Sequence, residues 1–182
     1  MQTRRAFFLT LISAAVASGW ARAEALTEAD RAALAALFQE WEEATFAGDF
    51  NAMMRTMPPA LWQRIAELSG VPLEDAVQKL DTLFADLMPT DLAGLGVKIT
   101  YDWSRTNFGE TSTGRPFVVI PRTLSAGTLT METPVLAIRD DGRWYAVQVD
   151  NLMIRAMLLQ AYPDLASIDF SAFPEPTMTF VE

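Results

Sequence analysis

Residues 134–149 have the sequence PVLAIRDDGRWYAVQV, which predicts a β-hairpin. Two apolar runs flank Asp141-Gly142, and an Asp-Gly pair in this position is typical of a two-residue hairpin turn. A turn of this length sets the register, because Ile138 then lies opposite Tyr145. The face that carries Ile138 is almost wholly apolar and is expected to face helices. The other face, which carries Trp144, is mixed and is expected to face solvent or a partner.

The residues before the hairpin predict further antiparallel strands. Apolar and polar residues alternate from Val97 to Trp103, which is the period of a strand with one buried face. Residues 104–115 are polar and predict a loop or an excursion at the sheet edge. Residues 117–120 are continuously apolar, as expected of a strand covered on both faces. Residues 129–138 lead into the hairpin.

The first half of the chain predicts helices. A helix is expected from the capping residue Thr27 to Gly48. A second helical segment begins at Asp49, is interrupted at Pro58-Pro59 and ends before a third that begins at Pro72. Helices followed by a meander of strands indicate an α+β domain, with the helices packed on one face of a curved antiparallel sheet.

The first helix is expected to have an apolar and an acidic side. Its apolar stripe contains Leu34, Leu37, Phe38 and Trp41. Its solvated side contains Glu40, Glu42 and Glu43.

The residues after the hairpin predict an apolar C-terminal helix. Residues 152–159 are apolar except for Arg155, so this helix has no polar face. Such a helix is buried all round or is covered by another chain. Residues 24–162 are expected to form a single domain, and residues 163–182 a tail.

Residues 1–23 are expected to be a signal peptide. Arg4-Arg5 precedes an apolar run, and Ala21 and Ala23 form an A-x-A cleavage site. The run is shorter than the ~20 residues of a membrane span, although a retained N-terminal anchor is the other interpretation. The segment Thr3–Phe7 resembles the twin-arginine export motif, with ordinary secretion as the alternative. We therefore expect a periplasmic protein with no stable membrane anchor after cleavage.

The composition excludes several kinds of chemistry. The 182 residues include no His and no Cys, which excludes a His–Cys metal site, a Cys nucleophile, a Ser–His triad and a disulfide. The net charge is −9, and loss of the three arginines of the signal peptide changes it to −12. This charge disfavours nucleic acid and anionic membranes as partners. We expect neither a cofactor nor a metal.

Three motifs carry a resemblance to a known family. They are Phe46-Ala47-Gly48-Asp49-Phe50, Thr113-Gly114-Arg115-Pro116 and Asp141-Gly142-Arg143-Trp144-Tyr145. On these motifs, residues 30–150 resemble the nuclear-transport-factor-two-like superfamily, which includes ketosteroid-isomerase-like domains with a cystatin-like cone fold. The resemblance implies a curved sheet wrapped over helices, whose interior is a pocket in some members and plain core in others. The family includes enzymes, binding modules and partner domains, so the fold does not decide the function.

The resemblance also implies two catalytic designs that need no His. An isomerase-like design uses an Asp base with a Tyr and a protonated acid as oxyanion donors, and an epoxide-hydrolase-like design uses two Asp around an Arg. The candidates are Asp102, Asp150, Tyr101, Tyr145, Arg115 and Arg122. Strand alternation directs Asp102 away from Tyr101. It also directs Asp150 away from the face of Tyr145. We therefore expect both carboxylates to be solvated or ion-paired at the sheet surface.

Aromatic and methionine side chains are the candidates for an apolar ligand site. They are Phe38, Trp41, Met53, Met57, Tyr101, Trp103 and Tyr145. The competing interpretation is that these side chains fill the core. The sequence predicts a non-catalytic exported domain that binds a small apolar ligand or a protein, a second copy among them. A small-molecule isomerase or hydrolase is the alternative, and a purely structural interaction domain is a third.

Overall fold

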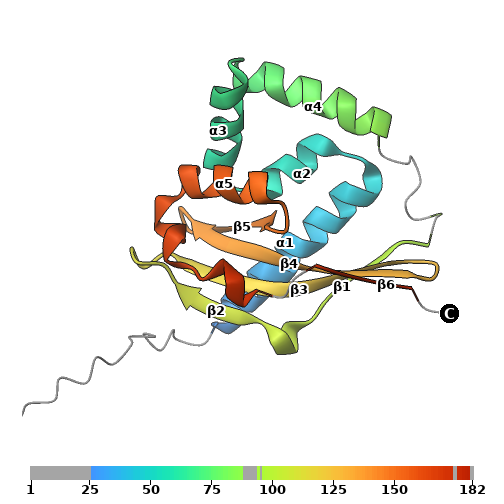
Figure 1. Cartoon of the computed structure of the whole chain (residues 1–182), viewed down its shortest axis with the longest axis vertical. Coiled ribbons are helices and arrows are strands. Elements are labelled where there is room, and N and C mark those ends of the chain that lie inside the picture. Colours follow the sequence, from blue (N-terminus) through green and yellow to red (C-terminus); the bar gives the residue numbers. More distant parts are fainter. Residues whose placement is uncertain (1–25, 88–93, 95, 174–175, 181–182) are drawn as a thin grey trace, which may run out of the picture.

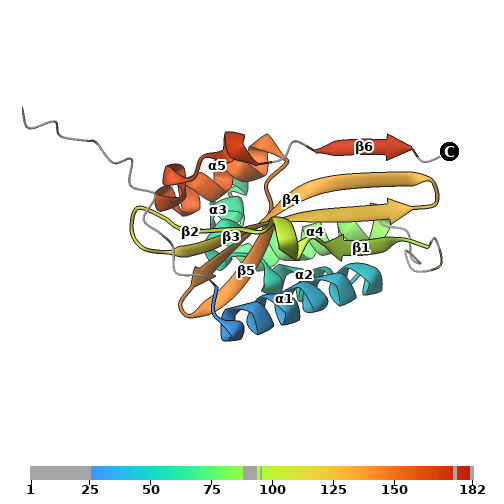
Figure 2. The same ribbon diagram turned by 90° about the horizontal axis from the view of Figure 1, so that it is seen from below.

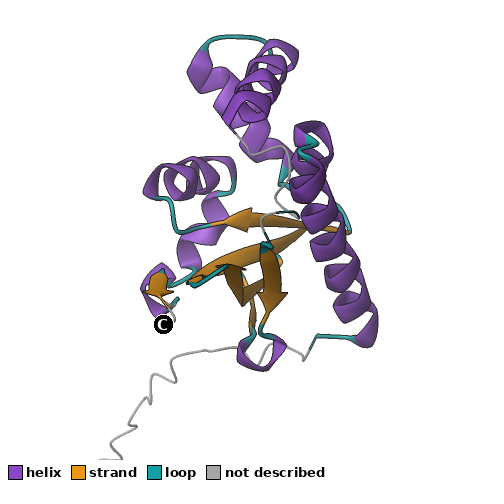
Figure 3. Cartoon of the chain, turned by 90° about the vertical axis from the view of Figure 1, so that its right-hand side faces the viewer, coloured by secondary structure: helices purple, strands orange, loops and turns teal. Residues whose placement is uncertain are grey.

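The protein is an α+β domain in which helices pack against a strongly curled antiparallel sheet (Figures 1 and 3). The computed structural model describes residues 26–87, 94, 96–173 and 176–180. The predicted signal peptide, with Ala21 and Ala23, lies outside the described residues. Export and cleavage therefore stay predictions.

The first half of the chain is helical, as predicted, and its longest helix is the first. They are α1 (Glu28–Ala47), α2 (Phe50–Thr56), α3 (Pro59–Ser69) and α4 (Leu73–Leu87). The predicted ends of α1 are confirmed. The Thr27 hydroxyl accepts a hydrogen bond from the backbone N–H of Asp30, and Gly48 ends the helix with a φ of 64°. The Pro58-Pro59 pair separates α2 from α3.

Two long strands run through both halves of the sheet. The strands are β1 (Lys98–Tyr101), β2 (Asn107–Glu110), β3 (Pro116–Ala126), β4 (Leu129–Asp140), β5 (Arg143–Gln148) and β6 (Thr177–Phe180). In one half, β2 and β5 flank β3 and β4, and in the other half β1 and β6 take those positions. The exchange of flanking strands occurs near Pro121 and Pro134, which lie opposite each other.

One local prediction for the strands differs from the structure. The alternating segment that begins at Val97 stops being a strand after Tyr101, because the Asp102 carboxylate caps the short 3-10 helix η1 (Trp103–Arg105). Of the two alternatives for residues 104–115, the structure agrees with an excursion at the sheet edge, because the segment contains the edge strand β2.

The predicted hairpin register is confirmed. Ile138 pairs with Tyr145 and Arg139 with Trp144. Asp141 and Gly142 have φ values of 47° and 79°. Two positive φ values in a row are the signature of a type I′ turn, whose twist matches that of the two strands.

The prediction for the mixed face of the hairpin is wrong, because both faces of the sheet are covered. Leu136 and Ile138 pack with α3, α5 and the C-terminal segment. Ala137 and Ala146, on the mixed face, pack under α1. Helices therefore lie on two sides of the sheet rather than on one (Figure 3).

Small side chains and one carboxylate explain why α1 lies on the mixed face. Ala137 and Ala146 project little, so a helix can approach the strands closely. The Trp144 indole donates a hydrogen bond to Asp30 of α1 at 3.1 Å, and Arg139 forms an ion pair with the same carboxylate at 3.2 Å. The polar groups of this face thus find partners on the helix instead of water.

The chain after the hairpin forms α5 (Leu152–Ala161), η2 (Pro163–Ser167), η3 (Phe170–Ala172) and then β6. α5 is not buried all round, because Leu152 and Met153 are exposed while Leu158 is fully buried. The following segment packs into the domain through Leu165 and Phe173, which belong to the core cluster under α5. The predicted apolar helix is therefore not the last element of the domain, because the strand β6 follows it.

Candidate functional site

A cluster of polar side chains lies between α1 and the sheet. Arg122 of β3 is at its centre and is only 7% exposed. Its guanidinium lies 5.5 Å from the ring centre of Trp41, and its Nη2 donates a hydrogen bond of 3.3 Å to the hydroxyl of Thr133. Its Nε is buried and has no hydrogen-bond partner among the described residues. Burial of this kind lowers the pKa of the Arg122 guanidinium.

Acidic and phenolic groups surround Arg122. The phenol of Tyr101, which lies opposite Arg122 in the β1–β3 ladder, is hydrogen-bonded to the Glu42 carboxylate. Asp150, just beyond β5, also attracts the guanidinium. Burial raises the pKa of the Glu42 carboxyl, although the hydrogen bond of Tyr101 and the charge of Arg122 lower it in part. Burial and the neighbouring Glu42 charge raise the pKa of Tyr101, so the phenol stays neutral.

The placement of Glu42 corrects the prediction that it belongs to the solvated face of α1. Glu43 is exposed as predicted, but Glu42 is half-buried. Helix periodicity places Glu42 at the margin of the apolar stripe, and the curled sheet reaches over that margin with Tyr101. The sequence alone does not show how far the sheet extends around the helix.

The catalytic candidates separate into four places, the last of which is the network of Arg115 with Asp140 and Asp164. Tyr101, Asp150 and Arg122 come together with Glu42, as described above. Asp102 lies outside this cluster and forms an ion pair of 2.6 Å with Arg105. Hydrogen bonds from Ser104 and Arg105 lower the pKa of Asp102 to about 2.

Tyr145 is also apart from the cluster around Arg122. It lies opposite Ile138, on the sheet face that α3 and α5 cover, and so does not meet Tyr101. The Arg143 guanidinium lies 5.4 Å from the centre of its ring.

The predicted apolar-ligand residues do not line one pocket. Phe38 stacks on Tyr101 with 4.4 Å between ring centres, and the edge of Trp103 packs against Phe38 at 5.9 Å. Phe38 and Trp41 are buried in the core under α1, and Met53 packs against the same cluster. Met57 packs against the other core cluster, and Tyr145 shares that side of the sheet. Two surface hollows of the described chain lie elsewhere, on α4 and between α3 and α5.

Arg115, in the second of the three motifs, holds the C-terminal segment onto the hairpin. Its Nε forms an ion pair of 2.9 Å with Asp164, and its Nη1 forms another with Asp140. Tyr162 donates a hydrogen bond of 3.0 Å to Asp140, and the Thr111 hydroxyl donates one of 2.9 Å to Asp164. Because each charge has a partner, we interpret this network as structural.

The half of the sheet beyond Pro121 and Pro134 forms what we call the distal arm. It comprises β1, β6 and residues 122–126 and 129–133. Apart from the paired Arg122 and Thr133 at its inner end, the arm alternates apolar and polar residues, so the register divides them between two faces. The polar face carries Lys98, Thr100, Thr123, Ser125, Thr130, Glu132, Thr177 and Thr179.

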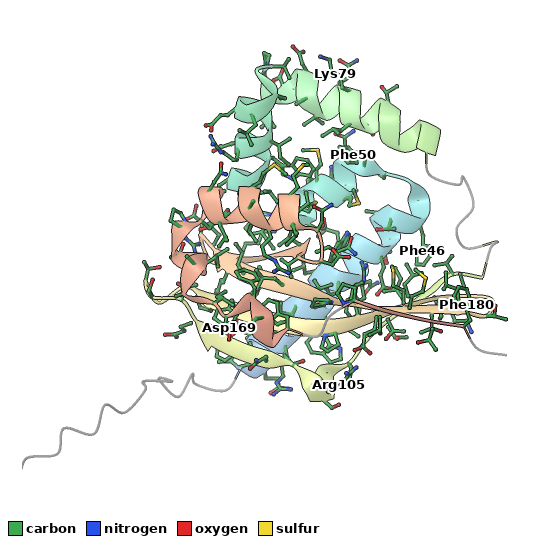
Figure 4. All side chains as sticks on the ribbon, in the orientation of Figure 1. Phe46, Phe50, Lys79, Arg105, Asp169 and Phe180 are labelled. Carbon is green, nitrogen blue, oxygen red and sulfur yellow. The ribbon has the colours of Figure 1, made fainter. Side chains whose placement is uncertain are left out.

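The apolar face of the arm lies on the same side of the sheet as Arg122. It carries Ile99, Leu124, Leu129, Met131, Met178 and Phe180. Met178 and Phe180 are 61% and 70% exposed, because β6 lies on the side of the molecule away from α1 (Figure 2). Phe180 is at the outer end of the arm (Figure 4). The alternation in 129–133 and 177–180 was the sequence signal for this face, which our sequence analysis missed.

The described part of the chain contains no group of three carboxylates, His or Cys that could hold a metal ion. None of its helices combines the length and the apolar character that are needed to cross a membrane. Comparisons with protein-family models, with curated proteins and with solved structures find no match to this chain.

Proposed function

We propose that this protein is an exported, non-catalytic domain that binds a protein partner through the apolar face of its distal arm. The observation that carries the proposal is the exposure of Met178 and Phe180 beside the apolar side chains of β4. Contiguous exposed apolar side chains on a folded domain mark interaction surfaces. Full burial of each of these two side chains would stabilise a complex by about 1.5–3 kcal/mol before the costs of association.

The shape of this surface favours a protein over a small molecule. Small-molecule sites are concave and enclose most of the ligand, whereas the arm offers the open face of a sheet edge. The net charge, −9 for the full chain and −12 without residues 1–23, favours a partner that surrounds its apolar contact with basic residues.

Face-specific photo-crosslinking tests this proposal. A photoreactive phenylalanine analogue is placed at Met178 in one variant and at the adjacent Thr179, on the polar face, in the other. Both variants are irradiated in periplasmic extract and read by mass spectrometry. We expect one protein adduct at position 178, lost when Phe180→Ser is added, and no matching adduct at position 179. Equal labelling at both positions, or none at 178, would contradict the proposal.

The second candidate is carboxylate catalysis at the cluster around Arg122. The observation in its favour is that the charges of Glu42 and Asp150 act on the buried guanidinium of Arg122, whose Nε has no hydrogen-bond partner among the described residues. The epoxide-hydrolase-like design that the resemblance implies has two Asp around an Arg, and this site departs from it in having Glu42 in place of one Asp. This candidate requires turnover of an apolar epoxide or of an unsaturated ketone, with loss of activity in Glu42→Gln while circular dichroism shows that the variant is still folded.

The resemblance to the nuclear-transport-factor-two-like superfamily is likewise a proposal. What supports it is a strongly curled antiparallel sheet with a long helix against it, which is compatible with a cone (Figure 3). The periplasmic location is also proposed, from the order of charge, apolar run and A-x-A in residues 1–23.

A further inference from the structure

We propose that the edge of β4 at Leu129–Glu132 is a strand-acceptor site that takes the C-terminal strand of a second copy of this chain in place of its own. In the structure this edge pairs with β6, from Leu129 opposite Phe180 to Glu132 opposite Thr177. The proposal goes beyond the proposed function and does not depend on it, because an exchanged strand would present the same apolar face.

β6 is held less firmly than the chain that precedes it. Phe173 is buried in the core, and Arg115 holds the preceding segment through Asp164. All four residues of β6 are exposed, and within the described residues it pairs with β4 alone. Its attachment therefore rests on the backbone hydrogen bonds and cross-strand side-chain pairs of one short ladder, whose net contributions are modest. Detachment of β6 would leave the two core clusters unchanged.

The acceptor edge fits the sequence of β6 on both of its faces. Met178 lies opposite Met131, which continues the apolar face, while Thr179 lies opposite Thr130 on the polar face. A β6 strand from a second copy would restore each of these pairs, so the exchanged dimer contains the same strand contacts as two closed monomers.

Charge and concentration limit the extent of exchange. Each copy carries a net charge of −9, which opposes association at low ionic strength. The chain's own strand also competes at the high effective concentration of a tethered segment. We therefore expect exchange to be reversible and to increase with protein and salt concentration.

Disulfide trapping between two variants tests the proposal, because the chain has no cysteine of its own. Residues directly opposite in an antiparallel pair lie at a Cα separation that a disulfide can span. Full-length Met131→Cys and Met178→Cys proteins are mixed with a mild oxidant. We expect a covalent heterodimer that forms about tenfold faster than in a matched mixture of Thr130→Cys and Met178→Cys, since register determines which thiols meet. Its yield should rise with concentration.

The double variant Met131→Cys/Met178→Cys checks the register within one chain. At low concentration it should form an intramolecular disulfide, and failure to do so would overturn the proposal by removing the pairing on which it rests. Equal rates in the two mixtures would overturn it too. So would homodimers of Met178→Cys alone that form as fast as the heterodimer, because these indicate contact between two β6 edges. The photo-crosslinking experiment detects a partner protein at Met178, whereas disulfide trapping detects β6 of one copy beside β4 of another. Either hypothesis can therefore fail while the other holds.

Discussion

At the scale of single residues, Trp41 links the apolar core to the polar cluster. It is buried under the sheet, and the Arg122 guanidinium lies over its ring. The same side chain therefore fills the space between helix and strands and shields a buried charge.

Replacement of Trp41 by Ala should lower the free energy of unfolding by about 3–5 kcal/mol, because it opens a cavity and leaves Arg122 without its aromatic neighbour. The matched control is Glu43→Ala on the exposed side of the same helix, which should change stability by no more than about 0.5 kcal/mol. Urea melts of both variants measure the difference. Similar losses in the two variants would show that α1 does not bury this face.

Glu42 should make stability depend on pH in the opposite direction to an ordinary surface acid. Burial raises its pKa in the folded state, so the unfolded chain releases the proton first as the pH rises. The contribution of Glu42 to the free energy of unfolding is therefore fully present below the ordinary pKa of Glu. It is lost as the pH rises through the raised pKa that Glu42 has in the folded state. The neighbouring Tyr101 and Arg122 keep their protons over this range, and Asp150 is the other charge that Arg122 attracts.

Glu42→Gln should remove this dependence. We expect thermal melts of the wild type to lose stability relative to Glu42→Gln as the pH increases from about 4 to 7. Glu43→Gln, next to it but exposed, should follow the wild type. Parallel curves for the wild type and Glu42→Gln would mean that the Glu42 carboxyl is solvated.

At the scale of elements, the hairpin turn sets the positions of β4 and β5. Gly142 has a φ of 79°, and an added Cβ would meet no atom within 4 Å. The cost of Gly142→Ala is therefore one of backbone conformation, about 1–2 kcal/mol. Asp141→Asn is the control, since Asn adopts the φ of 47° as readily and should stay within about 0.5 kcal/mol of the wild type. Chemical denaturation measures the free energy of unfolding of both variants. Equal losses of stability in Gly142→Ala and Asp141→Asn would contradict a type I′ turn.

Local sequence determines where the helices begin and end, but not which face of the sheet they cover. The helix boundaries lie where the sequence predicts them. α1 begins after Thr27 and ends at Gly48, and α3 begins at the Pro58-Pro59 pair. Local sequence predicts these positions because capping residues and prolines affect the backbone of their own few residues. Which sheet face each helix covers is not a local property. It depends on Asp30, which binds Trp144 and Arg139 from far along the chain.

At the scale of the whole molecule, we predict that residues 1–23 are a signal peptide that directs the chain to the periplasm. Mass spectrometry of protein from the periplasm should find Glu24 as the first residue, because cleavage is expected after Ala23. Replacement of Arg4 and Arg5 by Lys should block export if the twin-arginine route is used, and unchanged export would indicate general secretion. Full-length protein that begins at Met1 in a soluble cytoplasmic pool would contradict the prediction.

The sequence by itself determined the α+β class, the ends of α1, the proline break between α2 and α3, and the hairpin register. Each of these depends on a cap, a proline or a turn acting within a few residues. The tertiary structure alone decided that both sheet faces are covered, that Glu42 and Tyr101 meet at Arg122, and that Thr177–Phe180 returns to the edge of β4. These features join residues distant in sequence, and alternation assigns a side chain to a face without specifying what packs against it.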